Sequence, residues 1–226
     1  MESNNNPACM FGICGEAGIG KTTLVSYMYN KIRHHFEVAC FLTNIREKSD
    51  NNSINALKDL QRTLLYETVK ETQTMEDTTF DGNSQIKDKL SHKRVLLILD
   101  DVDSIEQLKA LAGGSDWFGY GSRIIITTRV ENELDKHHVA VTKYKMEELN
   151  SCESLQLFCW HAFKMSKPAD NYADICNHVV NYVKGFPRAL KAIGSNLKGL
   201  TVEECEMQLE KYRNVPNAFS FLVDSL

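Results

Sequence analysis

Gly15-Glu-Ala-Gly-Ile-Gly-Lys21-Thr22-Thr23 is the stretch that decides the fold of this chain. It matches the phosphate-binding pattern G-x-x-x-x-G-K-[ST] at every required position. The glycines allow a tight turn and a close approach of the backbone to phosphate oxygens, because they carry no Cβ. Lys21 supplies a mobile positive charge for the phosphates, and the Thr22 hydroxyl is suited to ligate Mg²⁺. We therefore predict a nucleotide phosphate site, with a coincidental glycine-rich turn as the alternative.

The residues on either side of this loop support the prediction. Before it, Ala8-Cys-Met-Phe-Gly-Ile13 is a short, mostly apolar run that suits a buried strand. After it, Leu24, Met28 and Ile32 recur every four residues, which predicts a helix with one buried face. A strand, a glycine loop and a helix in this order are the structural context that the motif requires.

Composition narrows the class of protein. A content of 42% hydrophobic and 25% charged residues over 226 positions is ordinary for a soluble globular chain. The net charge of −4 argues against a nucleic-acid partner, and no apolar run is long enough to span a bilayer. The seven cysteines form no C-x-x-C pair, so neither a disulfide framework nor a zinc site is indicated. We expect an intracellular protein that is cytoplasmic, with the nucleus as a second location.

Strand-like and helix-like segments alternate from Ala8 to about Met146. Apolar strand runs at Val38–Leu42, Val95–Leu99 and Arg123–Thr128 are separated by helical stripes, and the polar stretch Thr72–Asn83 is interpreted as a mobile surface loop. This rhythm predicts an α/β fold with an open parallel sheet and helices on both sides.

Beyond Glu147 the pattern becomes purely helical. Asn150 and Thr201 are each followed three positions later by Glu, the capping-box signature of a helix start. A helix between them is expected to stop near Gly185-Phe-Pro187. We therefore divide the chain into an α/β nucleotide-binding domain, residues 1–147, and a small helical domain, residues 148–226.

Two acids and an arginine complete the candidate site. Asp100 and Asp101 follow the apolar run Val95–Leu99, and Arg129 follows the next strand. Open α/β sheets bind ligands at the carboxyl ends of their strands, so Asp100 is predicted to hold Mg²⁺ and Asp101 to orient a water or sense the γ-phosphate. The alternative for the acids is a helix N-terminus. Arg129 is predicted to bind the γ-phosphate, with a salt-bridged surface arginine as its alternative.

Taken together, the motifs closely resemble the NB-ARC region of plant intracellular immune receptors, in the branch that carries a TIR domain and leucine-rich repeats. The resemblance covers nearly the whole chain in the expected order. It rests on Gly15–Thr23, Phe36–Glu47, Val95–Asp103, Gly119–Arg129, Leu155–Phe163 and Lys184–Leu190.

The resemblance implies a P-loop NTPase fold and roles for individual residues. In the family, the residues matching Gly20–Thr23 bind phosphates. With the rest of the loop motif, the candidate phosphate-binding set is Gly15, Gly18, Ile19, Gly20, Lys21, Thr22 and Thr23. In the family, the residue matching Asp100 serves Mg²⁺, that matching Arg129 senses the γ-phosphate, and that matching Pro187 packs near the adenine. The motif and the strand end add Thr22 as a second Mg²⁺ ligand and Asp101 as the catalytic candidate. In the family, ADP holds a closed state, ATP favours an open, oligomerising one, and slow hydrolysis resets the switch. The implied partners are an adenine nucleotide and other immune-receptor domains or subunits.

The chain departs from the family pattern in three respects. The first residues do not match the segment that in the family precedes the first strand and helps enclose the base, so we expect a less enclosed base. Arg188 stands where the family usually has leucine, and this charge costs free energy on burial unless it reaches solvent or phosphate. The sequence ends at Leu226, before the family's winged-helix subdomain, so we expect an incomplete lid and weaker binding and hydrolysis. Three hypotheses stay open: a switch that is at most a weak Mg²⁺-dependent ATPase, a P-loop ATPase or kinase with real turnover, and a degenerate interaction fragment.

Overall fold

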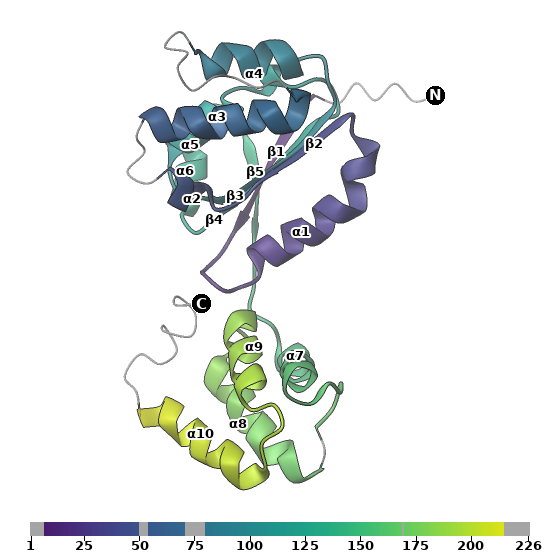
Figure 1. The fold of residues 1–226 in the computed structure, drawn as a ribbon, viewed down its shortest axis with the longest axis vertical. Coiled ribbons are helices and arrows are strands. Elements are labelled where there is room, and N and C mark those ends of the chain that lie inside the picture. Colours follow the sequence, from purple (N-terminus) through teal and green to yellow (C-terminus); the bar gives the residue numbers. More distant parts are fainter. Residues whose placement is uncertain (1–6, 50–53, 71–79, 169, 215–226) are drawn as a thin grey trace. The chain divides into compact units, whose positions relative to one another are not determined.

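The computed structural model describes residues 7–49, 54–70, 80–168 and 170–214. The chain divides into two compact units (Figure 1). The first comprises Met1–Gly15 with Lys21–Lys145, and the second comprises Glu16–Gly20 with Met146–Leu226. The division thus falls between Lys145 and Met146, and the middle of the glycine loop belongs to the second unit, which the sequence pattern did not indicate.

Within the described residues, the first unit contains one sheet of five parallel strands. The strands are β1 (Cys9–Cys14), β2 (Val38–Leu42), β3 (Val95–Val102), β4 (Arg123–Thr128) and β5 (Val141–Lys145), in the spatial order β2-β3-β4-β1-β5. Strand β4 therefore lies between β1, which leads into the glycine loop, and β3, which carries the acids. Their carboxyl ends share one edge of the sheet, as the parallel arrangement requires.

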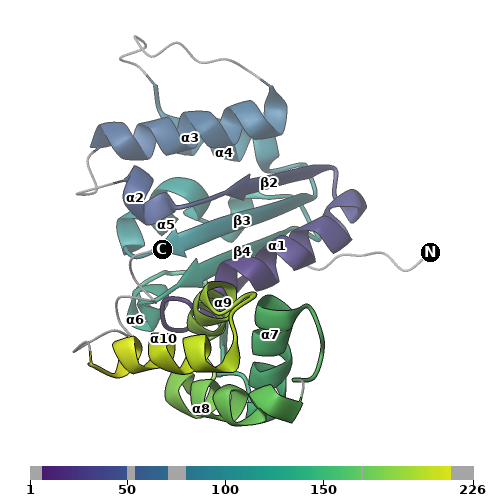
Figure 2. The same ribbon diagram turned by 60° about the horizontal axis from the view of Figure 1, so that its bottom comes forward.

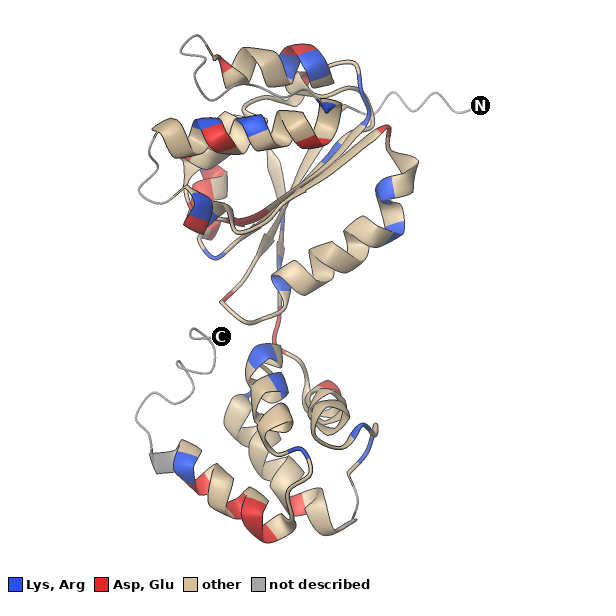
Figure 3. Ribbon diagram, viewed as in Figure 1, with Lys and Arg blue, Asp and Glu red and all other residues tan. Residues whose placement is uncertain are grey.

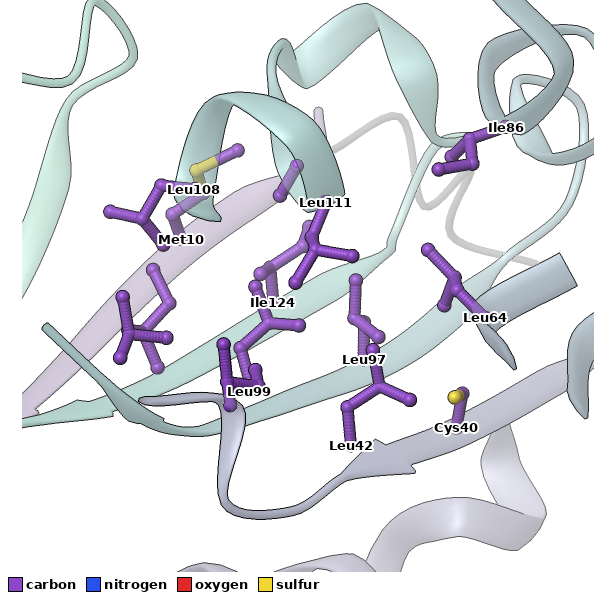
Figure 4. Packing of buried hydrophobic residues seen from close by; sticks show 14 of the residues in the cluster. Met10, Cys40, Leu42, Leu64, Ile86, Leu97, Leu99, Leu108, Leu111 and Ile124 are labelled. Carbon is purple, nitrogen blue, oxygen red and sulfur yellow. The ribbon is translucent and has the colours of Figure 1, made fainter. Parts of the chain in front are cut away.

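Helices cover both faces of this sheet (Figures 1 and 2). Helix α1 (Lys21–Ile32) lies on one face, and α3 (Ile54–Val69), α4 (Gly82–Leu90) and α5 (Ile105–Ala112) lie on the other. Figure 4 shows Leu97 of β3 beneath Leu111 of α5 and Leu64 of α3, and all three side chains are fully buried. The predicted run Val95–Leu99 is buried at every position because helices cover both sides of β3.

The second unit is helical. It contains α7 (Ser151–Phe163), α8 (Ala173–Val183), α9 (Pro187–Asn196) and α10 (Val202–Asn214), packed around Phe158 and Ile193. Both predicted capping boxes are confirmed, at Asn150 with Glu153 and at Thr201 with Glu204. Helix α9 was not expected, since Gly185-Phe-Pro187 was interpreted only as a stop. The proline instead takes the first helical position, where its missing N–H costs nothing.

Other elements also differ from the sequence predictions. The short helices α2 (Ile45–Lys48) and α6 (Glu131–Asp135) were not predicted. Of the loop predicted over Thr72–Asn83, positions 72–79 lie outside the described residues. Gly82 and Asn83 belong to α4, whose N-terminus is capped by Asp81, so the predicted loop was too long at this end. Among the described helices, none has both the length and the apolar character that crossing a membrane would require.

Candidate phosphate-binding site

The glycine loop is tied to the sheet at its first residue. The backbone N–H of Gly15 donates to the Thr128 carbonyl at 3.3 Å, which joins the end of β1 to the end of β4. Lys21 opens α1 six residues later, and its Nζ donates to the Gly15 carbonyl at 2.7 Å. The ammonium group is thereby held over the start of the loop. Thr22 and Thr23 follow in the first turn of α1, and both are exposed.

Lys21 is a buried cation, with 7% of its surface exposed. Burial lowers the pKa of its ammonium group, and the nearby positive charge of Arg129 lowers it further. The carboxylates of Asp101 and Asp100 oppose this shift. Burial makes the charged form of Lys21 costly. An additional anion beside the glycine loop, such as phosphate, would stabilise this charged form.

Asp100 joins three elements at the sheet edge. Its side chain is buried, and Oδ1 accepts hydrogen bonds from Thr22 Oγ1 at 2.9 Å and from Thr127 Oγ1 at 2.7 Å. These contacts connect β3, α1 and β4. Carboxylate and hydroxyl oxygens are the ligands that Mg²⁺ prefers, so this donor set fits the predicted metal. Thr127 was missed as a site residue; its position at the end of a buried strand was the available signal.

Asp101 has an unusual backbone and two ion pairs. Its φ of 59° is left-handed, and the β3–β4 register shifts between Leu99 and Val102. Carboxylate Oδ1 lies 3.3 Å from Arg129 Nε, and Oδ2 lies 3.2 Å from Arg46 Nε. Arg129 is thus a salt-bridged arginine at the sheet edge, as its alternative interpretation expected, and its contact with the γ-phosphate stays a prediction. Arg46, on α2, was missed, because the sequence does not indicate that residue 46 meets residue 101.

The helix N-terminus interpretation of the acids does not hold for this pair. Asp100 and Asp101 belong to strand β3, whereas the cap of α5 is Ser104, with Gln107 completing a capping box. The acids were expected to follow the strand; they lie inside it because β3 continues through the register shift to Val102. Their side chains therefore belong to the carboxyl edge of the sheet, and neither residue caps α5.

The middle of the glycine loop, Glu16–Gly20, belongs to the second unit. Gly18 and Gly20 have φ values of 76° and 103°, which residues with a Cβ rarely adopt. The Ile19 side chain is buried in the helical core. Pro187 opens α9, and its Cγ lies 4.0 Å from the position that a Cβ on Gly20 would take. The next residue, Arg188, donates its backbone N–H to the Gly18 carbonyl at 3.2 Å, and its side chain is half-buried rather than enclosed.

Comparison with known proteins gives a family match. The NB-ARC domain family model matches residues 1–168. The chain is 36% identical to TMV resistance protein N of Nicotiana glutinosa, covering 100% of this chain and 19% of that protein. It is 40% identical to Disease resistance protein RUN1 of Vitis rotundifolia, covering 96% of this chain and 16% of that protein. The chain thus spans less than a fifth of the length of these two relatives.

A solved structure shares the fold. A chain in the structure of Drosophila ORC bound to DNA matches with a TM-score of 0.56 and 13% identity, covering 98% of this chain and 64% of that chain. At this identity the likeness concerns the fold alone. Together with the parallel strand order and the glycine loop between β1 and α1, it agrees with the P-loop NTPase fold expected from the sequence.

Proposed function

This chain belongs to the NB-ARC domain family, and from that premise we propose that it is an ADP- and ATP-binding switch module of a plant immune receptor. The observation that carries the proposal is the buried Lys21 at the start of α1, next to the hydrogen-bonded pair Thr22 and Asp100. Both features lie where the glycine loop leaves the sheet. A phosphate chain with its metal ion would interact with all three side chains.

Phosphate binding is assigned to the loop Gly15–Thr23. Its backbone N–H groups and the N-terminus of α1 favour anions, and Lys21 adds a point charge for the β- and γ-phosphates. Ile19 would contribute its backbone, since its side chain is buried in the helical core. The left-handed glycines allow the backbone to approach the phosphates without a Cβ in the way.

Magnesium is assigned to Thr22 and Asp100. Among the residues that the structure describes, no group of three or more His, Cys, Asp or Glu side chains could hold a metal ion by itself. Mg²⁺ commonly uses one or two protein oxygens and takes the rest of its ligands from phosphates and water. We therefore propose that the ion arrives with the nucleotide, where it neutralises phosphate charge.

Arg129 is proposed to bind the γ-phosphate, and Asp101 to orient the attacking water. Both oxygens of Asp101 already have guanidinium partners. At least one of these pairs has to open before the carboxylate can take a proton from water. We therefore expect slow hydrolysis, which suits a switch better than an enzyme that depends on rapid turnover.

The helical region is proposed to contribute to the adenine site through Pro187. The pyrrolidine ring is an apolar surface beside Gly20 within the second unit. We propose the two domains 1–147 and 148–226, and a role in plant defence alongside other receptor domains or subunits. The disease resistance proteins that the chain resembles support this role, and the compartment we propose is the cytoplasm.

The first experiment identifies the nucleotide. Denaturing freshly purified protein and separating the released small molecules by chromatography is expected to yield ADP. Lys21→Ala should release none, because it removes the phosphate-binding charge. Lys31→Ala, on the same helix but exposed, is the matched control and should match the wild type. Equal occupancy in wild type and Lys21→Ala would contradict the proposed site.

The second experiment separates a switch from an ordinary enzyme. Phosphate release is measured under saturating Mg-ATP, where typical enzymes turn over about 1 to 1,000 times per second. We expect a rate far below this range, with a further loss in Asp101→Asn. Sustained rapid turnover would instead favour the ATPase or kinase hypothesis. An empty site that binds no added nucleotide would favour a degenerate interaction fragment.

A further inference from the structure

One carboxylate in the first unit holds two guanidinium groups. Arg46 Nε lies 3.2 Å from Asp101 Oδ2, and Arg129 Nε lies 3.3 Å from Asp101 Oδ1. The Arg46 side chain is 38% exposed and that of Arg129 is 35% exposed. Both arginines are therefore held by Asp101, and both remain open to a ligand in solution.

The position of Arg46 is fixed by buried hydrogen bonds. Ser49, which ends α2, donates from Oγ to the Ile45 carbonyl at 2.7 Å. Gln107 Nε2 donates to Ser49 Oγ at 2.7 Å and to Asp103 Oδ1 at 2.7 Å. Ser49 and Gln107 are both 1% exposed. This network connects α2 to the segment that follows Asp101, so the two partners of the ion pair are held on a common support.

The backbone beside each partner is in the left-handed region. Asn44, just before α2, has a φ of 54°, and Asp101 itself has a φ of 59°. Asn and Asp adopt this region more readily than other residues with a Cβ, and such conformations cluster at functional sites, where the surrounding structure fixes them. Both turns bring their side chains to the same edge of the sheet.

Charge at this edge favours an additional anion. The cationic side chains are Lys21, Arg46 and Arg129, and the carboxylates are Asp100 and Asp101. Of these, Asp100 is engaged by two hydroxyl groups. Figure 3 shows the acidic end of β3 beside the charged helix α2. Guanidinium groups match phosphate oxygens in a planar fork, so a terminal phosphate is a suitable further partner for both arginines.

We propose that Arg46 is a second γ-phosphate-binding residue, which Asp101 retains until a nucleoside triphosphate binds. The inference rests on the proposed nucleotide site and goes beyond it by assigning a residue that discriminates ATP from ADP. With ADP bound, Arg46 stays paired with Asp101. With ATP bound, the γ-phosphate takes over at least one nitrogen of Arg46, and Asp101 competes with it.

The test compares two ligands in one titration format. Displacement of fluorescent ADP gives the Kd of ADP and of a non-hydrolysable ATP analogue with Mg²⁺. In Arg46→Ala, we expect the analogue to bind roughly 10-fold more weakly, while ADP binding changes less than about 2-fold. Lys48→Ala removes a charge from the same helix, but this lysine is exposed and bonds Thr43 Oγ1. It is the matched control and should leave both Kd values near those of the wild type.

Two further variants keep the test decisive. Asp101→Asn removes the competing charge, so the analogue should gain affinity relative to ADP. Arg46→Gln removes the charge but keeps part of the side-chain length and an N–H donor, and it replaces Arg46→Ala if that variant no longer binds ADP. Equal changes for ADP and the analogue, or no change for either, would overturn the role of Arg46 while leaving the nucleotide site intact. Failure of wild-type protein to bind ADP would instead overturn the proposed function.

Discussion

Thr22 and Asp100 are 78 positions apart in the sequence, yet the Thr22 hydroxyl donates a 2.9 Å hydrogen bond to the Asp100 carboxylate. The second hydroxyl on the same oxygen comes from Thr127, at the end of the neighbouring strand. Oxygen atoms from three different elements are thereby brought together at the sheet edge. Such preorganisation lowers the cost of ligand binding, because the side chains are already ordered.

The Thr22–Asp100 pair predicts a magnesium-specific defect. Thr22→Val keeps the shape of the side chain and removes its oxygen, so we expect ADP affinity with Mg²⁺ to fall about 10-fold, as for loss of one contact to a charged group. Affinity in excess chelator should stay unchanged. Thr23→Val is the control, because Thr23 is assigned to phosphate binding and should act equally with and without metal. Isothermal titration under both conditions provides the measurement, and an identical loss in both would refute the metal role of Thr22.

Lys21 predicts a pH dependence of stability in the nucleotide-free protein. Burial and Arg129 lower its pKa in the folded state from the ordinary value of 10.5. Between the lowered pKa and 10.5, the unfolded chain binds more protons than the folded one, so the free energy of unfolding rises with pH across this window. Lys21→Met lacks this contribution.

The corresponding measurement is a difference between variants. Denaturant unfolding of wild type and Lys21→Met is compared near neutral pH and at about pH 9.5. The wild type should gain stability relative to Lys21→Met at the higher pH. Lys31→Met controls for the loss of an exposed lysine on the same helix. If the stability of the wild type relative to Lys21→Met stays constant or falls as pH rises, Lys21 is not destabilised in its charged form.

Much of the sheet could be predicted from the sequence, because its central strands have simple patterns. Val95–Leu99 is apolar at every position since both faces of β3 are covered, and the glycine loop follows β1 as its motif requires. Strand β5 escaped prediction for the opposite reason. It is an edge strand whose residues Thr142 to Lys145 are exposed, so no burial pattern marks it.

The candidate site was predictable only where a motif or a strand end marks the residue. Lys21, Asp100 and Arg129 were predicted in this way. Arg46 was not, because its partner Asp101 is reached through a short helix entered by the left-handed residue Asn44. Neither the left-handed turn at Asn44 nor the ion pair between Arg46 and Asp101 has a signal in the nearby sequence. Contacts distant in sequence therefore account for what the motif search missed.

The cysteines differ in their predicted reactivity. Burial is the largest cause that raises the pKa of the Cys40 thiol to about 12 and that of the Cys176 thiol to about 12. Cys152, in contrast, is exposed. Because the thiolate is the reactive form, we expect a thiol reagent at about pH 8 to label Cys152 quickly and to leave Cys40 and Cys176 unlabelled. Cys152→Ser should remove the fast phase. Denatured protein, in which all seven thiols react, calibrates the count, and rapid native labelling of Cys40 would contradict its burial.

Alanine substitutions at two left-handed glycines of the second unit distinguish the effect of backbone strain from an effect on ligand binding. Gly20 has a φ of 103° and Gly199 a φ of 79°, and an added Cβ meets nothing closer than 3.8 Å at Gly20 and nothing within 4 Å at Gly199. Alanine at either position should therefore lower the free energy of unfolding by a similar amount, roughly 1–2 kcal/mol, because of the backbone conformation alone. Gly199 lies outside the phosphate loop, which makes Gly199→Ala the matched control.

Nucleotide binding should distinguish the two variants. If alanine at position 20 relaxes out of the left-handed region, the peptide groups on either side rotate and no longer present their N–H groups to the phosphates. We expect Gly20→Ala to weaken ADP binding more than about 10-fold, or roughly 1.4 kcal/mol, whereas Gly199→Ala binds like the wild type. Thermal melting of both variants without nucleotide shows whether the strain is comparable. Equal ADP affinities alongside equal losses of stability would mean that the conformation of Gly20 does not matter for the phosphates.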